Sequence, residues 1–294
     1  MKFDEIAYPL PERWIEVAGA RICYVVREAA AGADRPVLLI PPLGRGLMQY
    51  RLNLDSLATI GPVVAFDPPG CGKSSMSGPA LELVDLAGHT RVAAAVADAA
   101  RQRGEVPDAP GLIIGTSFGA LVALALTETR PSLAHALALS DAAGARPGFV
   151  GRVFTSLMSR EWVMNRMGRG AWRRALERMF ARPDHPALAA NLELAMRLRS
   201  GPDWPDYLRA LARTTRAAQS MRPDGLIDAV RARNTPVLVI WGAHDRVTPL
   251  AWGRELSVRL NATLEVITDA GHFPNIESSA AFEQAVLRFW SAAA

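Results

Sequence analysis

The stretch GLIIGTSFG, from Gly111 to Gly119, decides the fold. Its first half is an unbroken apolar run, which is typical of a strand buried on both faces. Its second half reads G-x-S-x-G and leads directly into Phe118–Thr129, which has the pattern of a helix. A turn this sharp leaves no room for side chains at Gly115 and Gly119 and holds the serine hydroxyl exposed. The stretch therefore predicts Ser117 as a nucleophile at a sheet edge, rather than an inert glycine-rich junction.

Short runs of valine, isoleucine and leucine recur on both sides of this stretch, and segments with helical spacing separate them. Runs of this kind imply a mostly parallel sheet that helices flank on both faces. The expected strands are Arg21–Arg27, Val37–Ile40, Val63–Phe66, Gly111–Gly115, Leu133–Ser140, Val237–Trp241 and Leu264–Ile267. The expected helices are Met48–Leu57, a segment from the N-cap Asp85 to Gly104, Phe118–Thr129, Leu250–Leu260 and Ala280–Trp290.

The middle of the chain, residues 146–233, has a different pattern. It contains no buried-strand run, its helical patterns alternate with prolines and glycines, and 17 arginines stand against eight acidic residues. We expect a helical cap inserted into one α/β domain, so that residues 1–145 and 234–294 form the core and residues 146–233 the cap. Met158, Trp162 and Met164 are suited to line a substrate pocket, although residues of this kind more often pack the cap itself.

A serine hydroxyl is a poor nucleophile at neutral pH and needs a base with an orienting acid. His272 follows the last expected strand, so we expect it at the same sheet edge as Ser117. The other four histidines lie in segments where a surface or structural role is favoured. Two acids, Asp245 and Asp141, directly follow expected strands. We take Asp245 as the acid that orients His272 and keep Asp141 as its competitor.

Four separated motifs, together with the chain order serine, acid, histidine, resemble the α/β-hydrolase-fold superfamily. They are D-x-P-G-x-G-x-S at residues 67–74, G-x-S-x-G at 115–119, and the segments 241–249 and 271–277. The resemblance covers residues 13–145 and 234–292, and the cap matches no pattern of the family. It implies an α/β-hydrolase fold and a serine hydrolase that uses neither a cofactor nor a metal.

The resemblance also implies an oxyanion hole, made by backbone amides after the serine and after the strand Val37–Ile40. Members of the superfamily usually carry His-Gly in the second loop, whereas this chain has Pro41-Pro42. Because proline has no N–H, the donors are by position the amides of Leu43 and Phe118.

Charge narrows the possible partners. The chain of 294 residues has a formal net charge of +4 and contains 31 arginines but only two lysines. The cap carries +9 and the remainder −5. The surplus of positive charge in the cap therefore indicates either attraction between cap and core or an anionic substrate. It does not indicate nucleic acid, because no nucleic-acid-binding motif occurs. The segment Gly72–Ser74 resembles the end of a phosphate-binding loop, but Asp67 stands where that loop needs glycine.

The N-terminal residues include acids and prolines where a signal peptide has an apolar core. No apolar run reaches the roughly 20 residues that span a bilayer. Cys23 and Cys71 lack the spacing of a zinc site or a disulfide framework. We therefore expect a cytoplasmic protein without a membrane span, and the oligomeric state stays open.

The most direct function is hydrolysis of a carboxylic ester or related acyl bond in a small apolar or anionic molecule, through an acyl-enzyme on Ser117. The same triad would serve a carbon–carbon bond hydrolase or an acyltransferase. A catalytically idle member of the fold that binds a small ligand is an alternative of another class.

Overall fold

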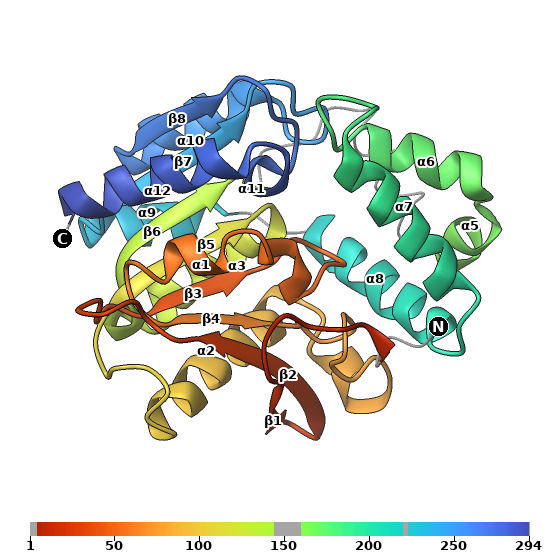
Figure 1. Ribbon diagram of the computed structural model, residues 1–294, viewed down its shortest axis with the longest axis horizontal. Helices are drawn as coiled ribbons and strands as arrows, with labels where there is room; N and C mark the ends of the chain where they lie inside the picture. Colours follow the sequence, from red (N-terminus) through yellow and green to blue (C-terminus); the bar gives the residue numbers. More distant parts are fainter. Residues whose placement is uncertain (1–4, 144–159, 220–222, 294) are drawn as a thin grey trace.

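The computed structural model describes residues 5–143, 160–219 and 223–293, and a sheet of eight strands lies at its centre (Figure 1). The strand order is β1-β2-β4-β3-β5-β6-β7-β8. Strands β3 to β8 are parallel, and β2 is antiparallel to both its neighbours. The mostly parallel α/β sheet is confirmed. The strands are Arg13–Val17 (β1), Ala20–Arg27 (β2), Val37–Ile40 (β3), Val63–Phe66 (β4), Gly111–Thr116 (β5), Ala134–Ser140 (β6), Val237–Gly242 (β7) and Thr263–Ile267 (β8).

Strand β1 is the one that the sequence pattern did not predict. It joins β2 through a two-residue turn at Ala18 and Gly19, whose φ angles are 48° and 81°. Positive φ at both positions suits the tight turn that links twisted antiparallel strands. Trp14 and Ile15 remain partly exposed at this sheet edge. The continuous apolar run of a buried strand is therefore missing from the sequence of β1.

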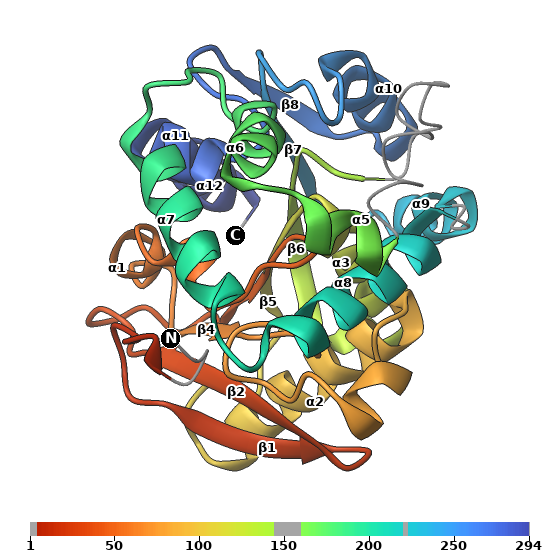
Figure 2. The ribbon, with the colours of Figure 1, turned by 90° about the vertical axis from the view of Figure 1, so that its right-hand side faces the viewer.

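Helices flank both faces of the sheet (Figures 1 and 2). Helices α2, α3, α9 and α10 share one apolar cluster with the sheet, and α1 and α12 share another. Side chains alternate between the two faces, so that Leu38 and Ile40 face the first cluster and Val37 and Leu39 the second. These helices are Leu54–Leu57 (α1), Leu86–Gln102 (α2), Phe118–Thr129 (α3), Asp224–Ala232 (α9), Leu250–Leu260 (α10) and Ser279–Ala293 (α12).

Local signals set the ends of α2 as predicted. The Asp85 carboxylate accepts a hydrogen bond from the Gly88 amide at 2.7 Å, which caps the N-terminus. At the other end Gly104 has a φ of 69°, and Glu105 N donates to Ala100 O at 2.9 Å. A left-handed residue with this bond pattern is a common helix stop.

The prediction of one crossover helix over Met48–Leu57 was wrong. The segment forms a 3₁₀ turn, Leu47–Tyr50 (η2), and the single-turn helix α1. Asn53 lies at the break between them, and its side chain donates to Asn275 O at 3.1 Å and to Glu283 at 2.8 Å. Hydrogen bonds to residues far away in the chain therefore stabilise the interruption of the helix. The periodicity of residues 48–57 does not reveal these bonds. The other short elements are Gly78–Glu82 (η3), Pro131–Leu133 (η4) and Pro274–Glu277 (α11).

Four helices, α5 to α8, form a cap at the carboxyl edge of the sheet (Figure 2). They are Glu161–Arg166 (α5), Arg169–Glu177 (α6), Pro186–Arg199 (α7) and Trp204–Gln219 (α8). One apolar cluster joins them and reaches Phe273 and Ile276 of the core. Helix α8 packs tightly on the loops after β3 and β4, since a Cβ at Gly70 would lie 2.3 Å from the Ala210 side chain. Residues 146–159 and 220–222 of the expected cap lie outside the described residues.

The position of helix α9 differs from the prediction that the cap extends to residue 233. Sequence placed it in the cap, but it contacts α3 and α10, and Ile227 and Val230 join the core cluster on that face of the sheet. The cap helices therefore end with α8. In the described part of the chain, no helix is both long and apolar enough to cross a membrane.

Candidate active site

Ser117 lies at the turn between β5 and α3 with φ 54° and ψ −116°. A non-glycine residue with positive φ stores strain that the surrounding structure must hold. Two close approaches explain the flanking glycines. A Cβ at Gly115 would lie 2.3 Å from the carbonyl oxygen of Gly119, and one at Gly119 would lie 2.2 Å from that of Ile40. The turn therefore closes only with glycine at both positions.

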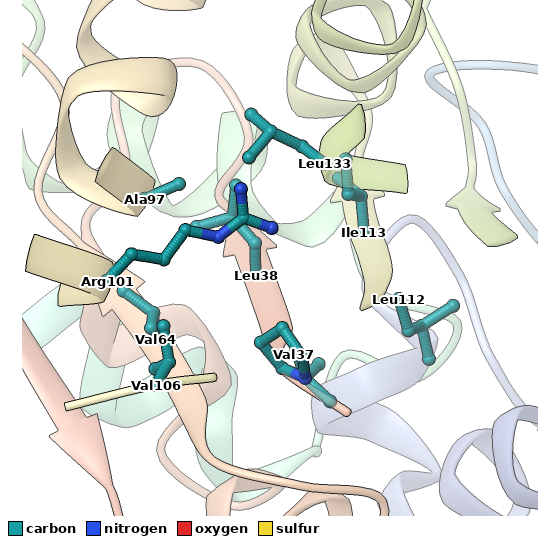
Figure 3. A pocket seen from close by; sticks show the side chains of 10 residues that line it. Val37, Leu38, Val64, Ala97, Arg101, Val106, Leu112, Ile113 and Leu133 are labelled. Atoms are coloured by element: carbon teal, nitrogen blue, oxygen red, sulfur yellow. The ribbon is translucent and has the colours of Figure 1, made fainter. Parts of the chain in front are cut away.

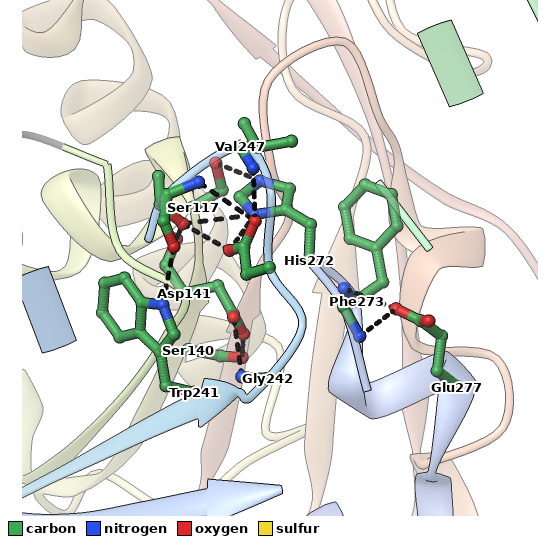
Figure 4. Close-up of polar contacts among 12 residues, drawn as sticks. Ser117, Ser140, Asp141, Trp241, Gly242, Val247, His272, Phe273 and Glu277 are labelled. Carbon is green, nitrogen blue, oxygen red and sulfur yellow. Dashed lines mark hydrogen bonds and ion pairs between the residues drawn. The ribbon is translucent and has the colours of Figure 1, made fainter. Parts of the chain in front are cut away.

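Ser117, His272 and Asp245 lie together at the carboxyl edge of the sheet, where sequence predicted them. Figure 4 shows Ser117 beside His272. Ser117 Oγ is 3.0 Å from His272 Nε2, and His272 Nδ1 is 2.7 Å from Asp245 Oδ2. All three side chains are buried. The imidazole can thus take a proton from the hydroxyl while the carboxylate fixes its orientation.

The Asp245 carboxylate accepts several further hydrogen bonds. Val247 N and Thr248 N donate to Oδ1 at 2.7 and 3.0 Å, and Thr248 Oγ1 donates to Oδ2 at 2.5 Å. Burial acts to raise the pKa of Asp245, but the charge of His272 and the hydrogen bonds from His272 and Thr248 outweigh it, so the pKa is lowered. Asp245 is therefore ionised, as an orienting acid must be.

Asp141, the competing acid, lies close by but does not bind the imidazole. Its Oδ1 accepts from Gly242 N at 2.9 Å, and Ser140 Oγ donates to Oδ2 at 2.7 Å. Burial, and next the charge of Asp245, raise the pKa of Asp141 well above its usual range. The environment of the fully buried Asp141 therefore favours its protonated form, in contrast to that of Asp245.

Asp141, Asp245 and His272 also form the group of described residues whose oxygen and nitrogen atoms, all within 4.8 Å of one another, would suit a metal ion. The same atoms of Asp245 and His272 bind each other at 2.7 Å. We interpret the cluster as the triad with a second carboxyl group.

The two residues whose amides are expected to form the oxyanion hole belong to segments that are in contact with each other. Phe118 is the first residue of α3, where backbone N–H groups have no acceptor within the helix. Leu43 lies in the loop after β3 with its side chain partly buried against the core. Gly119 packs against the carbonyls of Ile40 and Pro41, so this loop and the start of α3 are in contact.

The 67–74 loop has a structural role. The buried Asp67 carboxylate accepts from Leu47 N and Lys73 N, both at 2.8 Å, and from the Tyr8 hydroxyl. Burial raises the pKa of Asp67 to about 6 in spite of these bonds. The Lys73 ammonium pairs with Glu12. Lys73 and Asp67 thus bind protein groups, as expected for a loop that does not hold phosphate.

Sequence reasoning missed the role of Glu277. Its carboxylate accepts from the amides of Gly271 (3.0 Å), Phe273 (3.1 Å) and Ala181 (2.6 Å). The first two flank His272, and Ala181 precedes α7 of the cap. Glu277 therefore fastens the histidine loop to the cap. Its position within the 271–277 motif was the available signal.

Of the three expected pocket residues, the structure describes Trp162 and Met164. Trp162 is 57% exposed, and its ring lies near the Arg166 guanidinium. Met164 is fully buried in the cap cluster. Met158 lies outside the described residues. An exposed position for Trp162 argues against the expected lining role, and Met164 packs the cap.

The other histidines have structural or surface positions, as expected. Burial lowers the pKa of His89 to about 4, and its Nδ1 lies 2.9 Å from Asp85 O. His185 Nδ1 accepts from Ala187 N at the start of α7. His135 Nε2 lies 2.8 Å from Ala293 O. His244 is exposed.

The fold and the site define an enzyme with a serine at a strand-to-helix turn beneath a helical cap. A sequence profile described as "Alpha/beta hydrolase family" matches residues 26–285, and the chain belongs to that family. The superfamily predicted from the motifs is thus confirmed, and the chain is a hydrolase-type enzyme.

Similar proteins differ in the reaction that their names describe. The chain is 29% identical to 2-hydroxymuconate semialdehyde hydrolase of Pseudomonas sp. (strain CF600) over 94% of its own length and 93% of the relative. It is 25% identical to the "Dihydrolipoyllysine-residue acetyltransferase component of acetoin cleaving system" of Pseudomonas putida over 97% and 70%. The chain covers between 12% and 70% of the length of the first curated relatives that it matches. The enol-lactonase structure from Burkholderia xenovorans LB400 has a TM-score of 0.75 at 22% identity, covering 95% and 100% of the chains; it supports the fold alone.

Proposed function

We propose that the protein hydrolyses a carboxylic ester or related acyl bond of a small molecule through Ser117, His272 and Asp245. The observation that carries this proposal is the continuous chain of contacts from Ser117 Oγ to His272 (3.0 Å) and on to Asp245 (2.7 Å). The strained turn at Ser117 supports it, because a functional constraint accounts for the strain.

The reaction proceeds in two halves. Ser117 Oγ attacks the carbonyl carbon while His272 Nε2 takes its proton, and His272 then returns that proton to the leaving group. Asp245 stabilises the imidazolium in both halves. The amides of Phe118 and Leu43 stabilise the oxyanion, a contribution of a few kcal/mol in hydrolases of this kind. Water, deprotonated by His272, attacks the acyl-enzyme and releases the acid.

A fluorophosphonate probe and a series of p-nitrophenyl esters test the proposal. We expect the wild type to be labelled and to hydrolyse at least one ester, and Ser117→Ala to lose both activities. Ser132→Ala changes an exposed serine and is the matched control. Full labelling or turnover in Ser117→Ala would overturn the assignment of the nucleophile. Ligand binding without turnover of any acyl substrate would favour the idle, ligand-binding alternative.

A carbon–carbon bond hydrolase on the same triad is the second candidate. The similarity to 2-hydroxymuconate semialdehyde hydrolase, which extends over nearly the whole length of the chain, favours this candidate. Running a ring-fission product beside the esters separates the two. A kcat/KM at least a hundredfold higher for the ring-fission product would select carbon–carbon hydrolysis.

A further inference from the structure

Arg45 lies at the contact between the cap and the core and takes no part in the triad. It follows Leu43 by two residues in the loop after β3. Its guanidinium carbon lies 5.3 Å from the centroid of the Phe273 ring, and the His272 ring centroid lies 5.1 Å from the same centroid. Arg45 and the imidazole therefore both border the Phe273 ring.

The cap holds the Arg45 guanidinium in place. Arg45 Nη1 donates to Oδ1 of Asn191 in α7. The Asn191 side chain is itself fixed, because its Nδ2 donates to Ala187 O at 2.7 Å. Behind the loop, the Tyr207 hydroxyl donates to Gly44 O at 3.1 Å. Two helices of the cap thus contact adjacent residues of this one loop.

Arg45 forms no ion pair with any carboxylate in the described residues. Exposed arginines of the cap do pair, as Arg173 with Glu177 (2.7 Å) and Arg197 with Glu193 (3.3 Å). Burial lowers the pKa of Arg45, Tyr207 acts to raise it and the charge of Arg51 to lower it, and the guanidinium stays charged. Arg45 is half-buried, and even partial removal of a charge from water without a counter-charge is costly. One neutral amide leaves most of its five N–H donors free for a ligand.

Two buried donors lie in the apolar cluster of the cap. The indole nitrogens of Trp172 and Trp204 have no hydrogen-bond partner among the described residues. Their rings lie 5.7 Å apart, and the Trp204 ring is 5.4 Å from the Tyr207 ring, whose hydroxyl binds the loop beside Arg45. The cap interior next to Arg45 thus has an excess of donors, which suits a ligand that supplies acceptors.

The apolar hollow shown in Figure 3 is no alternative place for the substrate. It is lined by Val37 and Leu112, at the amino ends of β3 and β5, and by Arg101 of α2. The triad lies at the opposite, carboxyl edge of the sheet. Arg101 already donates to Ala109 O at 2.7 Å and pairs with Asp108 at 3.5 Å.

We propose that Arg45 binds a carboxylate of the substrate, so that the enzyme prefers acyl substrates with a carboxylate close to the scissile bond. The proposal rests on the function proposed for Ser117. A guanidinium offers paired N–H donors that match the two oxygens of a carboxylate. Charge-assisted bonds of this kind correspond to a preference of about tenfold to a hundredfold.

Two matched pairs of esters test the proposal, because an amide is a neutral mimic of a carboxylate. Mono-p-nitrophenyl glutarate against p-nitrophenyl 4-carbamoylbutanoate places the charge on the acyl side. Acetoxybenzoate against acetoxybenzamide, both para-substituted, places it on the leaving group. We expect kcat/KM to favour the carboxylate by at least tenfold in one pair. Arg45→Gln should reduce that preference to less than threefold, and Arg45→Lys should keep part of it.

Arg174→Gln is the matched control, because it removes the same charge from an exposed position on α6. We expect this variant to keep the preference, and the wild type to keep it at 0.5 M salt, since screening weakens distant exposed charges most. Equal loss in Arg174→Gln, or loss with salt, would assign the preference to the overall charge of the cap. An unchanged preference in Arg45→Gln, or none in the wild type, would overturn the proposal.

A binding measurement separates this proposal from the proposed function. In Ser117→Ala, calorimetry with the intact glutarate ester and its amide should show the same preference, and the Ser117→Ala/Arg45→Gln double variant should lose it. Turnover that depends on Ser117 without any carboxylate preference would refute the role of Arg45 alone. Carboxylate binding that depends on Arg45, without turnover or labelling, would refute the role of Ser117 alone.

Discussion

Asp141 and Asp245 are two buried carboxyl groups in contrasting states, and substituting each with asparagine should have opposite consequences. Asparagine resembles a protonated aspartic acid in shape and charge. Asp141→Asn therefore replaces a carboxyl group whose protonated form the fold favours, whereas Asp245→Asn removes a charge that His272, Val247 and Thr248 all bind. We expect Asp245→Asn to lower kcat by about 10⁴-fold, as in other triads, and Asp141→Asn to lower it less than tenfold.

Stability should separate the two variants by its dependence on pH. The folded-state pKa of Asp141 is raised by burial and by the charge of Asp245, so the wild type loses stability relative to Asp141→Asn as pH rises above the ordinary aspartate pKa. The loss is about 1.4 kcal/mol for each pH unit up to the folded-state pKa. Asp141→Asn should not show this loss of stability, because asparagine does not titrate. It should equal the wild type near pH 4 and be more stable at pH 7 to 8.

The Asp245 variant should show the reverse trend. The folded-state pKa of Asp245 is lowered, so its contribution is present above the ordinary pKa and disappears as pH falls through the folded-state value. Asp245→Asn should therefore be less stable than the wild type at pH 7, and the deficit should shrink in acid.

Urea unfolding of the three proteins between pH 4 and 8.5, with ester hydrolysis at pH 7.5, measures both effects. Two results would refute the reasoning. One is a loss of kcat in Asp141→Asn as large as that in Asp245→Asn, which would make Asp141 the orienting acid. The other is a deficit of stability in Asp141→Asn that grows with pH.

Three further substitutions probe the scaffold. Glu277→Gln weakens the acceptor for three amides, so we expect a loss of 1–3 kcal/mol in urea unfolding and a lower kcat as the His272 loop loosens. Gly119→Ala forces a Cβ to within 2.2 Å of the Ile40 carbonyl, so we expect a fall in melting temperature with loss of fluorophosphonate labelling. Because the pKa of His89 is lowered to about 4, the contribution of His89 to stability should fall by about 1.4 kcal/mol per pH unit on acidification from 6.5 toward 4. Urea titrations should show this fall as the difference in stability between the wild type and His89→Gln.

Exposed positions supply the controls for these variants. Glu255 is exposed on α10, and Gly168 has no atom within 4 Å of a Cβ placed on it. Glu255→Gln and Gly168→Ala should stay within about 0.5 kcal/mol of the wild type. Activity unchanged in Glu277→Gln, a stable Gly119→Ala, or a difference in stability between the wild type and His89→Gln that does not change with pH would each contradict the corresponding argument.

Sequence sufficed for those parts of the fold and site that local rules control. The ends of parallel strands meet at one sheet edge, so residues directly after strands, such as Asp245 and His272, could be placed near Ser117 from the chain alone. The same rule placed Asp141 there too. Only the contacts of each carboxylate, with the imidazole for one and with Ser140 and Gly242 for the other, separate the two acids.

The features that could not be predicted from sequence depend on contacts between distant segments of the chain. The amphipathic pattern of α9 identifies an apolar face, but not whether the cap or the sheet buries it. The helix predicted over Met48–Leu57 breaks where Asn53 binds Asn275, more than two hundred residues away in the chain. The exposed ring of Trp162 illustrates the same limit, since composition alone does not tell a lining residue from a surface one.

The charge division also takes on a different meaning in the structure. Attraction between a basic cap and an acidic core would be strongest through ion pairs across their contact, yet each ion pair described for residues 160–219 joins two residues of that segment. Cap arginines instead pair with acids of the cap. The cap and the core meet through apolar packing and through bonds such as His272 N to Met179 O, at 2.7 Å. Arg45, a residue of the core, is a positive charge at this contact for which the described residues supply no ion pair. Selection for an anionic substrate, if the ester pairs reveal it, should therefore follow this one side chain and not the arginine content of the cap.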